Sequence, residues 1–577
     1  MEGVTYDEAG RLINKIEVIP KRSEDPVYRG YVYIIEDLWN FQSVELLLTT
    51  GSMKIPGLDS LAIQQVYVPV QEPDAWKIFT QNIKFKIGTF GFKLGGAFTS
   101  IYSSYDVDPQ LSDKYFDNQV FTVKEGANEK DYDFWASVRP IPLTEEESVD
   151  YVRKDSLQEV RKSKVYLDSV DAKNNQFKPL DLLFGYDYDR SYNKEYFSFK
   201  SPLNTVFFNT VQGWNFDLDF QYSKYYGDNY LKALSLNPKL NYGFSDKQLR
   251  ASLAFSYRFN RINYARLSVS GGREATQFNS RNPITNMGNT IASIWSKRNY
   301  MKLYDRTYGQ VGWSQELFNG VYINSNISYN DRKALVNRSD YSLRNPEGRE
   351  YTSNDPTNPN NDGLFFDPHQ ALVLNASLRI RINQKYSRYP EEKYSEGTKW
   401  PDFWIVYKKG INAFGSDVNY DFLSLQLRDN YIPAGVWGYS KIRLEVGQFI
   451  NDGRLQFMDW RHFNGNQLDF SIPSRYIYSF KDLPYYSHST NNRYFEAHFE
   501  HYFNGFILDK IPAIRKLGFM LVGGAAYLKT AELPAYYEFS LGLDRIGFGP
   551  LRLFRVDGVA AYTGNDWNYR VLIGVAL

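Results

Sequence analysis

The chain ends on Trp567-Asn568-Tyr569-Arg570-Val571-Leu572-Ile573-Gly574-Val575-Ala576-Leu577, and this stretch decides the fold. Every second position from Trp567 to Leu577 is aromatic or aliphatic, and the positions between them are polar, small or tolerated. Alternate side chains of an extended strand point to opposite faces, so one face of this segment is wholly apolar. A tilted transmembrane strand needs about 9–11 residues. The segment therefore predicts a membrane-spanning β-strand.

Strands with the same alternation recur through the C-terminal two thirds of the chain. Over residues 372–382, aliphatic side chains alternate with Asn375, Ser377, Arg379 and Arg381. Burying two arginines between dry sheets is costly unless each is paired, whereas a water-filled lumen removes that cost while lipid covers the other face. A two-layer sandwich gives a similar alternation, but the recurrence, the strand lengths and the aromatic strand ends favour a barrel. Further segments of this kind are residues 214–223, 249–260 and 321–329.

Counting these strands to the C-terminus gives about sixteen, an even number as bacterial single-chain barrels require. If the N-terminal region and the C-terminus both lie in the periplasm, tight turns fall on the periplasmic side and long insertions outside, which is the usual asymmetry. The turns are residues 226–229, 319–320 and 547–549, and the insertions are residues 275–301, 333–369 and 451–492. Two segments break the rule: residues 245–247 are short yet external, and residues 384–401 are long yet internal.

Two regions precede the predicted barrel, which we assign to residues 194–577. Residues 1–108 contain alternating segments separated by Gly, Pro and Asp, which predicts a periplasmic antiparallel β domain. This region resembles the half-open sheets of periplasmic lipoprotein carriers, whose concave face holds acyl chains; a plain structural sheet is the alternative. Residues 109–193 form a charged connector, in which Thr144 and Glu147 make a capping box that opens a helix ending near Asp171.

The composition excludes several classes of protein. No apolar run approaches the roughly 18 residues that a spanning helix needs, and the mean hydropathy is −0.49, so a helical membrane protein is excluded. The 67 basic and 66 acidic side chains nearly cancel, which gives no footprint for nucleic acid. The absence of cysteine excludes disulfides and thiolate metal sites. The N-terminus lacks the pattern of a signal peptide; since an outer-membrane barrel must be exported, we expect a fragment without its natural start.

Clusters that carry chemistry are scarce. Glu496, His498 and Glu500 alternate along one strand face while His501 points to the other, and this spacing is not that of a helical zinc motif, so we interpret the row as lumenal polar side chains. Residues 358–363 match the first half of a calcium loop, but His369 stands where the bidentate Glu belongs, which leaves calcium in residues 355–369 open. No phosphate loop, nucleophile elbow or acid–base pair is present. We expect no catalytic residue, cofactor or resident metal, and hence no enzyme.

Five stretches resemble a Bacteroidota outer-membrane family of undefined function, often labelled "carboxypeptidase regulatory-like domain-containing protein". They are INKIEVIPKRSEDPVYRGYVY (13–33), FWASVRPIPLTEEE (134–147), FNTVQGW (208–214), KRNYMKLY (297–304) and RYFEAHFEHYFNGFILDKIPAIRK (493–516). The resemblance covers nearly the whole chain. Members of that family usually begin with a signal peptide and a small β-sandwich, which this sequence does not show.

The predicted barrel also resembles the sixteen-stranded insertase and translocase superfamily that assembles outer-membrane proteins. The shared features are the strand count, Gly549-Pro550-Leu551-Arg552 shortly before Asp557, and a large external loop before the last five strands. In that superfamily the loop folds back into the lumen and is anchored by the Arg of a V-R-G-F/Y motif. The matching place here is Arg461 with Phe463, without the glycine, and the resemblance implies Glu496 and Glu500 as lumenal partners. An ordinary loop arginine is the alternative.

These observations predict a non-enzymatic barrel of the Gram-negative outer membrane that assembles or translocates outer-membrane proteins or lipids. Its partners would be outer-membrane lipids and client proteins or lipoproteins, and not nucleic acid. A first strand near residues 195–209, irregular and carrying Pro202, would form a weak seam with the last strand. A transport or solute-binding channel is the alternative.

Overall fold

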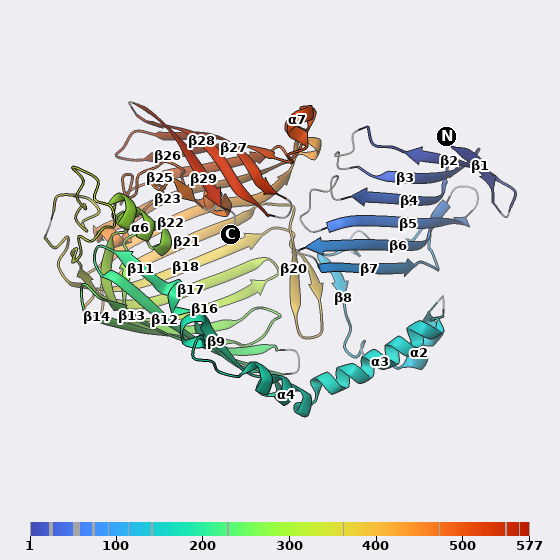
Figure 1. Ribbon diagram of the computed structural model, residues 1–577, viewed down its shortest axis with the longest axis horizontal. Helices are drawn as coiled ribbons and strands as arrows, with labels where there is room; N and C mark the ends of the chain where they lie inside the picture. The colour runs from blue at the N-terminus through green and yellow to red at the C-terminus, as the bar shows by residue number, and fades with distance from the viewer. Residues whose placement is uncertain are drawn as a thin grey trace.

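The computed structural model describes residues 2–7, 9–21, 27–49, 58–71, 75–89, 92–112, 115–127, 129–139, 142–227, 230–361, 363–471, 473–548, 551–564 and 566–575. They form two large antiparallel sheets, joined by a partly helical connector, and one small three-stranded sheet (Figure 1). The protein is therefore mostly β, with a large antiparallel sheet in its C-terminal part. No helix in these ranges is long and apolar enough to cross a membrane.

The N-terminal sheet is a single layer of seven strands in chain order. Its strands are β1 (Gly3–Tyr6), β2 (Leu12–Val18), β3 (Arg29–Ile35), β4 (Phe41–Thr49), β5 (Leu58–Gln71), β6 (Ala75–Thr89) and β7 (Phe92–Ile101). The register aligns Ile63, Ile83 and Phe98 on one face, and Ala62 with Lys84 on the other. Phe98 is 64% exposed, so part of the apolar face is open.

Between β7 and the large sheet, which begins at Gly185, the described residues form one short strand and four α-helices: β8 (Gln119–Thr122), α2 (Tyr132–Val138), α3 (Glu145–Lys162), α4 (Lys164–Asn174) and α5 (Asp181–Phe184). The predicted capping box opens α3, because Glu147 N donates to Thr144 Oγ1 at 3.2 Å and Thr144 N donates to Glu147 Oε2 at 2.9 Å. The single helix expected to end near Asp171 is instead two helices, since Ser163 ends α3 and its side chain caps α4.

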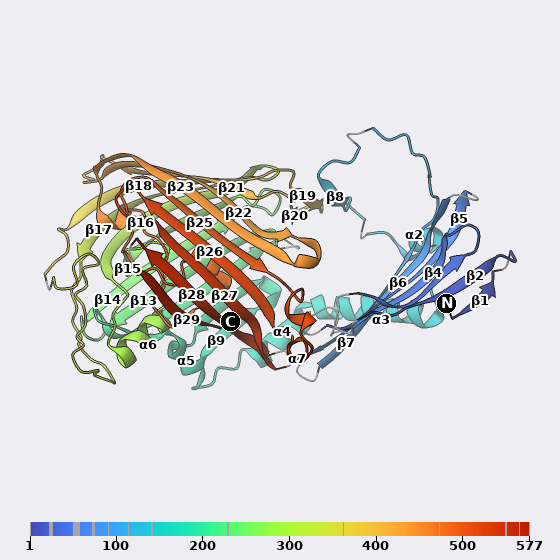
Figure 2. The same cartoon turned by 90° about the horizontal axis from the view of Figure 1, so that it is seen from above.

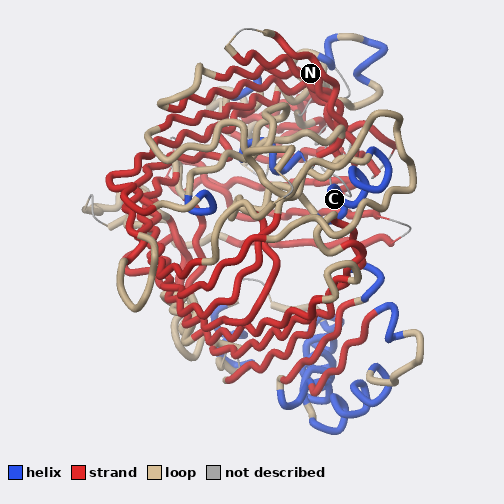
Figure 3. Tube along the Cα trace, turned by 90° about the vertical axis from the view of Figure 1, so that its left-hand side faces the viewer, coloured by secondary structure: helices blue, strands red, loops and turns tan. Residues whose placement is uncertain are grey.

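The large sheet runs from β9 to β29, and the order of its strands brings β29 back beside β9. It curls into a barrel-like wall, seen from one end in Figure 3. Its strands are β9 (Gly185–Arg190), β10 (Glu195–Lys200), β11 (Val206–Asn209), β12 (Gly213–Tyr226), β13 (Lys232–Gly243), β14 (Gln248–Arg258), β15 (Arg266–Gln277), β16 (Leu303–Phe318), β17 (Val321–Ala334), β18 (His369–Arg381), β21 (Asp402–Ile411), β22 (Asn419–Pro433), β23 (Tyr439–Arg454), β24 (Phe470–Ser471), β25 (Tyr494–Tyr502), β26 (Met520–Thr530), β27 (Tyr536–Phe548), β28 (Leu551–Thr563) and β29 (Trp567–Val575). The 3-10 helix η2 (Pro202–Thr205) separates β10 from β11, which is the irregularity expected at Pro202.

The alternation predicted for the C-terminal stretch holds in β29 over the described residues. Tyr569 and Val571 are 72% and 64% exposed on the outer side of the wall, whereas Leu572 between Val571 and Ile573 is fully buried. Ala576 and Leu577 lie outside the described residues. The interior face carries charge: Arg381 Nε donates to Asp402 Oδ1 of the neighbouring strand at 2.9 Å. Pairing within the wall thus removes much of the cost of turning arginine inward.

The three long insertions lie at one end of the wall, because successive strands alternate in direction. The segment at residues 384–401, which broke the predicted asymmetry, lies at the opposite end. It forms the hairpin β19 (Lys385–Arg388) and β20 (Lys393–Gly397), and β8 of the connector adds to β19 in parallel (Figure 2). Its length is explained by this small sheet, which ties the connector to the wall.

Candidate functional site: the inserted loop and the seam

Residues 455–493, between β23 and β25, form what we call the inserted loop. It contains η4 (Phe457–Asp459), β24 and η5 (Pro473–Tyr478). Phe463, Phe480 and Leu483 of this loop are buried and belong to one apolar cluster with wall residues such as Tyr494 and Tyr536. Burying these large side chains against the inner face of the wall holds the loop inside it.

Arg461 joins the inserted loop to two strands of the wall. Its Nη2 lies 2.5 Å from Glu496 Oε2 of β25 and 3.0 Å from Glu445 Oε1 of β23. The guanidinium carbon also lies 5.0 Å from the ring centroids of Phe463 and Tyr494. Two carboxylates and two aromatic rings therefore enclose one buried guanidinium, an arrangement that suits the planar fork of arginine.

The carboxylates around Arg461 are shared with other cations. Arg443 pairs with both Glu445 and Glu496, and its Nη1 lies 2.6 Å from Glu496 Oε1. Arg281 Nη2 lies 3.3 Å from Glu445 Oε1. Two carboxylates thus face three guanidinium groups, so the cluster carries an excess positive charge.

A second charged cluster fastens the other limb of the inserted loop. Lys481 Nζ lies 3.4 Å from Glu500 Oε1 and 3.3 Å from Asp557 Oδ1. Arg555 of β28 pairs with the same two carboxylates, at 3.0 and 2.6 Å. The backbone N–H of Lys481 also donates to both carboxylate oxygens of Glu538, at 2.8 and 2.9 Å. Because these groups are almost fully buried, breaking any one pair leaves an uncompensated charge.

A third contact fastens the start of the inserted loop. Arg332 of β17 donates to both carboxylate oxygens of Asp459, at 2.7 and 2.8 Å. Such a bidentate pair is among the strongest charge-assisted hydrogen bonds. The loop is therefore held at three separate places on the wall.

The last strand has a partner on each side. β28 pairs with one edge of β29 over nine residue pairs. β24 of the inserted loop pairs with β29 in parallel over two, Phe470 with Ile573 and Ser471 with Gly574. In addition, Ile573 N donates to Asp469 O at 3.0 Å. A short piece of the loop therefore covers part of the outer edge of the last strand.

The helix α6 (Asn286–Ser296) covers an edge of β11 in the same way. Phe208 N donates to Thr290 Oγ1 at 2.9 Å, and Asn289 Nδ2 donates to Phe208 O at 3.1 Å. The two covering elements touch each other, because a Cβ on Gly288 of α6 would lie 2.8 Å from Leu468 of the inserted loop. We call the series β11, α6, β24 and β29 the seam.

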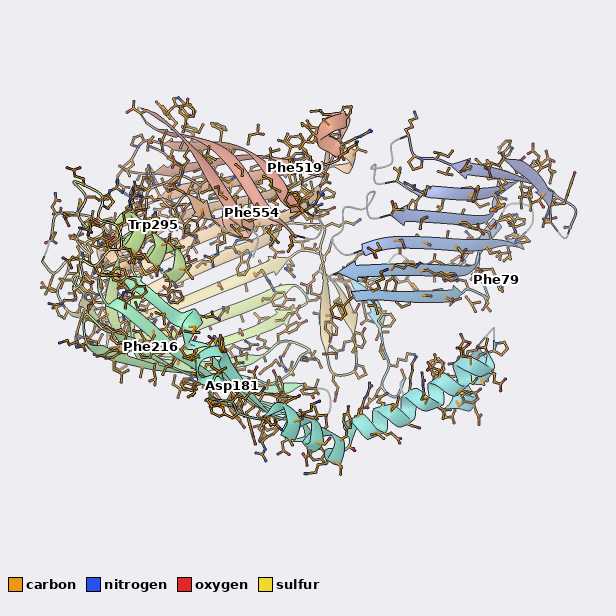
Figure 4. The ribbon with its side chains drawn as sticks, viewed as in Figure 1. Phe79, Asp181, Phe216, Trp295, Phe519 and Phe554 are labelled. Atoms are coloured by element: carbon orange, nitrogen blue, oxygen red, sulfur yellow. The ribbon has the colours of Figure 1, made fainter. Side chains whose placement is uncertain are left out.

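The outward side of α6 is apolar. Met287, Ile291 and Trp295 recur every four residues and are 57%, 43% and 58% exposed, which places them on one helix face. Figure 4 marks Trp295 on α6 near the long loops. The apolar outer surface of the wall therefore continues over α6 at the seam.

Comparison with known proteins decides the family. Residues 180–543 match the model "Family of unknown function (DUF5686) C-terminal domain", and residues 1–105 match "Family of unknown function (DUF5686)". The chain belongs to the DUF5686 family. No curated protein matches it.

Among solved structures, the DUF5686 chain is similar to three kinds of outer-membrane barrel. The first is BamA from Haemophilus ducreyi lacking POTRA domains 1–3, with 13% identity, 67% of this chain and 71% of that chain covered, and a TM-score of 0.35. The second is CdiB from Acinetobacter baumannii, with 12% identity, coverages of 64% and 58%, and a TM-score of 0.32. The third is a triple mutant of Rhodopseudomonas blastica porin, with 8% identity, coverages of 62% and 89%, and a TM-score of 0.26. Similarity at this level says nothing of activity.

The structure brings three of the four residues predicted as a loop anchor together. Arg461 contacts both Phe463 and Glu496. Glu500 was expected beside Arg461, but it binds the inserted loop through Lys481 instead, because it lies four residues further along β25. Lys481, Arg555, Glu445 and Asp459 were not found from the sequence, since no local spacing marks them.

The residues considered as metal ligands are the histidines of β25 and residues 355–369. His498 Nε2 lies 2.9 Å from Glu496 Oε1, while His501, on the other face, contacts Ser440 Oγ at 2.8 Å. Within the described ranges, no three side chains of the His, Asp or Glu types gather as metal ligands. In the segment left open for calcium, Asp362 lies outside the described residues.

Asp355 of that segment is engaged by its own loop. It accepts hydrogen bonds from Thr357 N and Asn358 N, at 2.7 and 3.0 Å, and from Asn361 Nδ2 at 2.8 Å. Burial by itself would raise the pKa of Asp355, but these hydrogen bonds outweigh it and hold the pKa below its usual value. The carboxylate therefore organises a turn.

Proposed function

We propose that this DUF5686 chain is a non-enzymatic barrel of the Gram-negative outer membrane, with about sixteen spanning strands, that assembles or translocates outer-membrane proteins or lipids. Its N-terminal sheet would lie in the periplasm, and its partners would be outer-membrane lipids and client proteins or lipoproteins. The outer membrane of Bacteroidota is the setting that the sequence resemblance implies. The observation that carries the proposal is the seam, in which short elements of the loops cover strand edges.

A strand edge inside a membrane has to be covered, because an unsatisfied backbone N–H or C=O costs several kcal/mol in hydrocarbon. A neighbouring strand that pairs along the whole edge covers it permanently. Here β24 contributes only two residue pairs to β29, whereas β28 contributes nine. With a net contribution of about 0.5–1.5 kcal/mol per hydrogen bond, the short cover is the one that can be exchanged.

Exchange at this edge would let a client strand add to β29 in place of β24. Main-chain hydrogen bonds then supply the affinity, as in other cases of strand addition. No cofactor or reacting group is needed for such a step. The three charged contacts of the inserted loop would return β24 to the edge after the client leaves, and Arg461 would act as the anchor of this movement.

The test is a disulfide that locks β24 onto β29. Because the chain has no cysteine, Phe470→Cys with Ile573→Cys gives a single cross-link. The matched control joins β28 to β29 through Ala560→Cys and Tyr569→Cys, which are also paired positions. In cells that depend on this chain, the first lock should stop outer-membrane protein or lipid delivery until a reductant is added, and the control lock should not. Normal delivery through the locked seam would reject the proposal.

A solute channel is the second candidate. The charged inner face of the wall favours it, since such side chains set selectivity in channels. The inserted loop argues against a permanently open path, because Phe480 and Leu483 are fully buried within the wall. Conductance in planar bilayers separates the two candidates: a steady open pore would support the channel.

A further inference from the structure

The seam encloses a cavity of about 660 Å³, within the range of roughly 300–1,000 Å³ usual for ligand sites. It lies between the start of α6, the inserted loop and the end of β29. The apolar part of its lining includes Met287, Leu468, Phe470, Tyr485 and Val575. Such a surface suits a chain of methylene groups.

The cavity reaches the outer side of the wall. Val575 shares a strand face with Val571 and Ile573, which is the face directed away from the interior. Met287 belongs to the exposed apolar stripe of α6. A ligand would therefore enter from the side, in the plane of the bilayer, and not along the barrel axis.

The polar part of the lining includes two cationic side chains. Arg281 and Arg475 both line the cavity. Arg281 belongs to the cluster with three guanidinium groups for two carboxylates, so its charge is only partly balanced. Arg475 is exposed and makes no ion pair with any residue that the structure describes. One 3-10 turn further, the ring of Tyr478 lies 5.8 Å from the guanidinium of Arg428, which adds positive charge on the same side.

The cavity does not present these strand edges as free hydrogen-bonding groups. The cover provided by β24 and α6 already satisfies Ile573 N and Phe208 N. A peptide strand would need these groups, whereas an acyl chain needs none. The combination of an apolar lining, a lateral position and unbalanced guanidinium groups fits an amphiphile with an anionic head.

We propose that this cavity binds an anionic phospholipid, with an acyl chain between α6 and β29 and the phosphate on the side of Arg281 and Arg475. The inference rests on the proposed function, because it takes the wall to span a membrane, and it deepens that function by naming a lipid as a ligand of the seam. A client strand, a second copy of the chain or a zwitterionic lipid are the other occupants that the experiment distinguishes.

The experiment is native mass spectrometry of the full chain released from nanodiscs that contain equal amounts of phosphatidylglycerol and phosphatidylcholine. The wild-type chain should retain phosphatidylglycerol in preference. Arg281→Gln with Arg475→Gln should lower that preference about tenfold, since it removes charge-assisted hydrogen bonds to the phosphate. Arg493→Gln, an exposed arginine of the same loop outside the lining, is the matched control and should retain lipid as the wild type does.

A second variant tests the acyl-chain part of the site. Met287→Asp places a carboxylate in the apolar lining at a side chain that is more than half exposed, so it leaves no cavity in a packed core. Ile291→Asp makes the same change one turn away on α6, outside the lining, as the control. Only Met287→Asp should lower lipid retention, again by about tenfold.

Several outcomes would overturn the inference: equal retention of both lipids by the wild type, unchanged retention by either cavity variant, or recovery of a peptide or a second copy in place of lipid. The locked seam described above reports separately on the proposed function. If the lock stops delivery while no anionic lipid is retained, the inference fails and the function stands. If anionic lipid is retained and the lock has no effect on delivery, the proposed function fails and the lipid site stands.

Discussion

Substituting Glu496 should loosen the inserted loop more than substituting Arg461, although the two side chains pair with each other. After Arg461→Met, Glu445 still pairs with Arg443 and Arg281, and Glu496 with Arg443. Two carboxylates then face two guanidinium groups, so the cluster is balanced. The loss is about that of one hydrogen bond between charged groups, about 1.5–3 kcal/mol.

Glu496→Gln has the opposite effect on the balance. It leaves three guanidinium groups around the single carboxylate of Glu445, in a place where Glu496 itself is only 1% exposed. An uncompensated buried charge costs about 3–5 kcal/mol. Since 1.4 kcal/mol corresponds to a factor of about ten, opening of the loop should rise more than about a hundredfold, against at least about tenfold for Arg461→Met.

Hydrogen exchange over residues 457–492 of the detergent-solubilised chain measures this opening directly. Glu350→Gln is the matched control, because this glutamate is 84% exposed although it also forms an ion pair, and it should leave exchange unchanged. The reasoning would be refuted if Arg461→Met opened the loop as much as Glu496→Gln.

Two further predictions concern the loops. Burial lowers the pKa of Lys302 to about 7, against about 10.4 in the unfolded chain. Between these two pH values the folded state binds fewer protons than the unfolded state. The local stability of residues 335–368 should therefore rise with pH. Limited proteolysis should show less cleavage there at pH 9.5 than at pH 7, and Lys302→Met should abolish the difference; cleavage that increased with pH would contradict the sign. Removing residues 457–490 should convert a closed wall into one that conducts steadily in planar bilayers, and an unchanged trace would mean that the inserted loop does not block the lumen.

The strand at the C-terminus was predictable because its pattern is local. Alternation with a period of two needs only neighbouring residues, and the described part of β29 follows it through Tyr569, Val571 and Ile573. The position of Arg461 came from a resemblance, which supplied long-range information that spacing does not contain. Its contact with Glu496 depends on how residues 35 positions apart meet inside the wall.

The seam could not be predicted from the sequence. β24 is two residues long, so no periodicity marks it, and its partner Ile573 is about a hundred residues away. Thr290 and Asn289 are ordinary helix residues until Phe208 is placed beside them. Glu500 was assigned to Arg461 and not to Lys481 for the same reason: the strand pattern predicts the face of the wall that it occupies, but not which part of a loop crosses that face.

The most direct test of the account is the environment of the outer face of β29. Tyr569 and Val571 are among the most exposed side chains of the wall, so in water a cysteine at either position would react quickly with a membrane-impermeant maleimide. In native membranes we predict that Tyr569→Cys and Val571→Cys stay unlabelled until the protein is denatured, because hydrocarbon covers them. Asn568→Cys, which precedes Tyr569 and points to the opposite face of the strand, should be labelled. Rapid labelling of positions 569 and 571 in intact membranes would contradict a membrane-spanning wall and everything proposed for its seam.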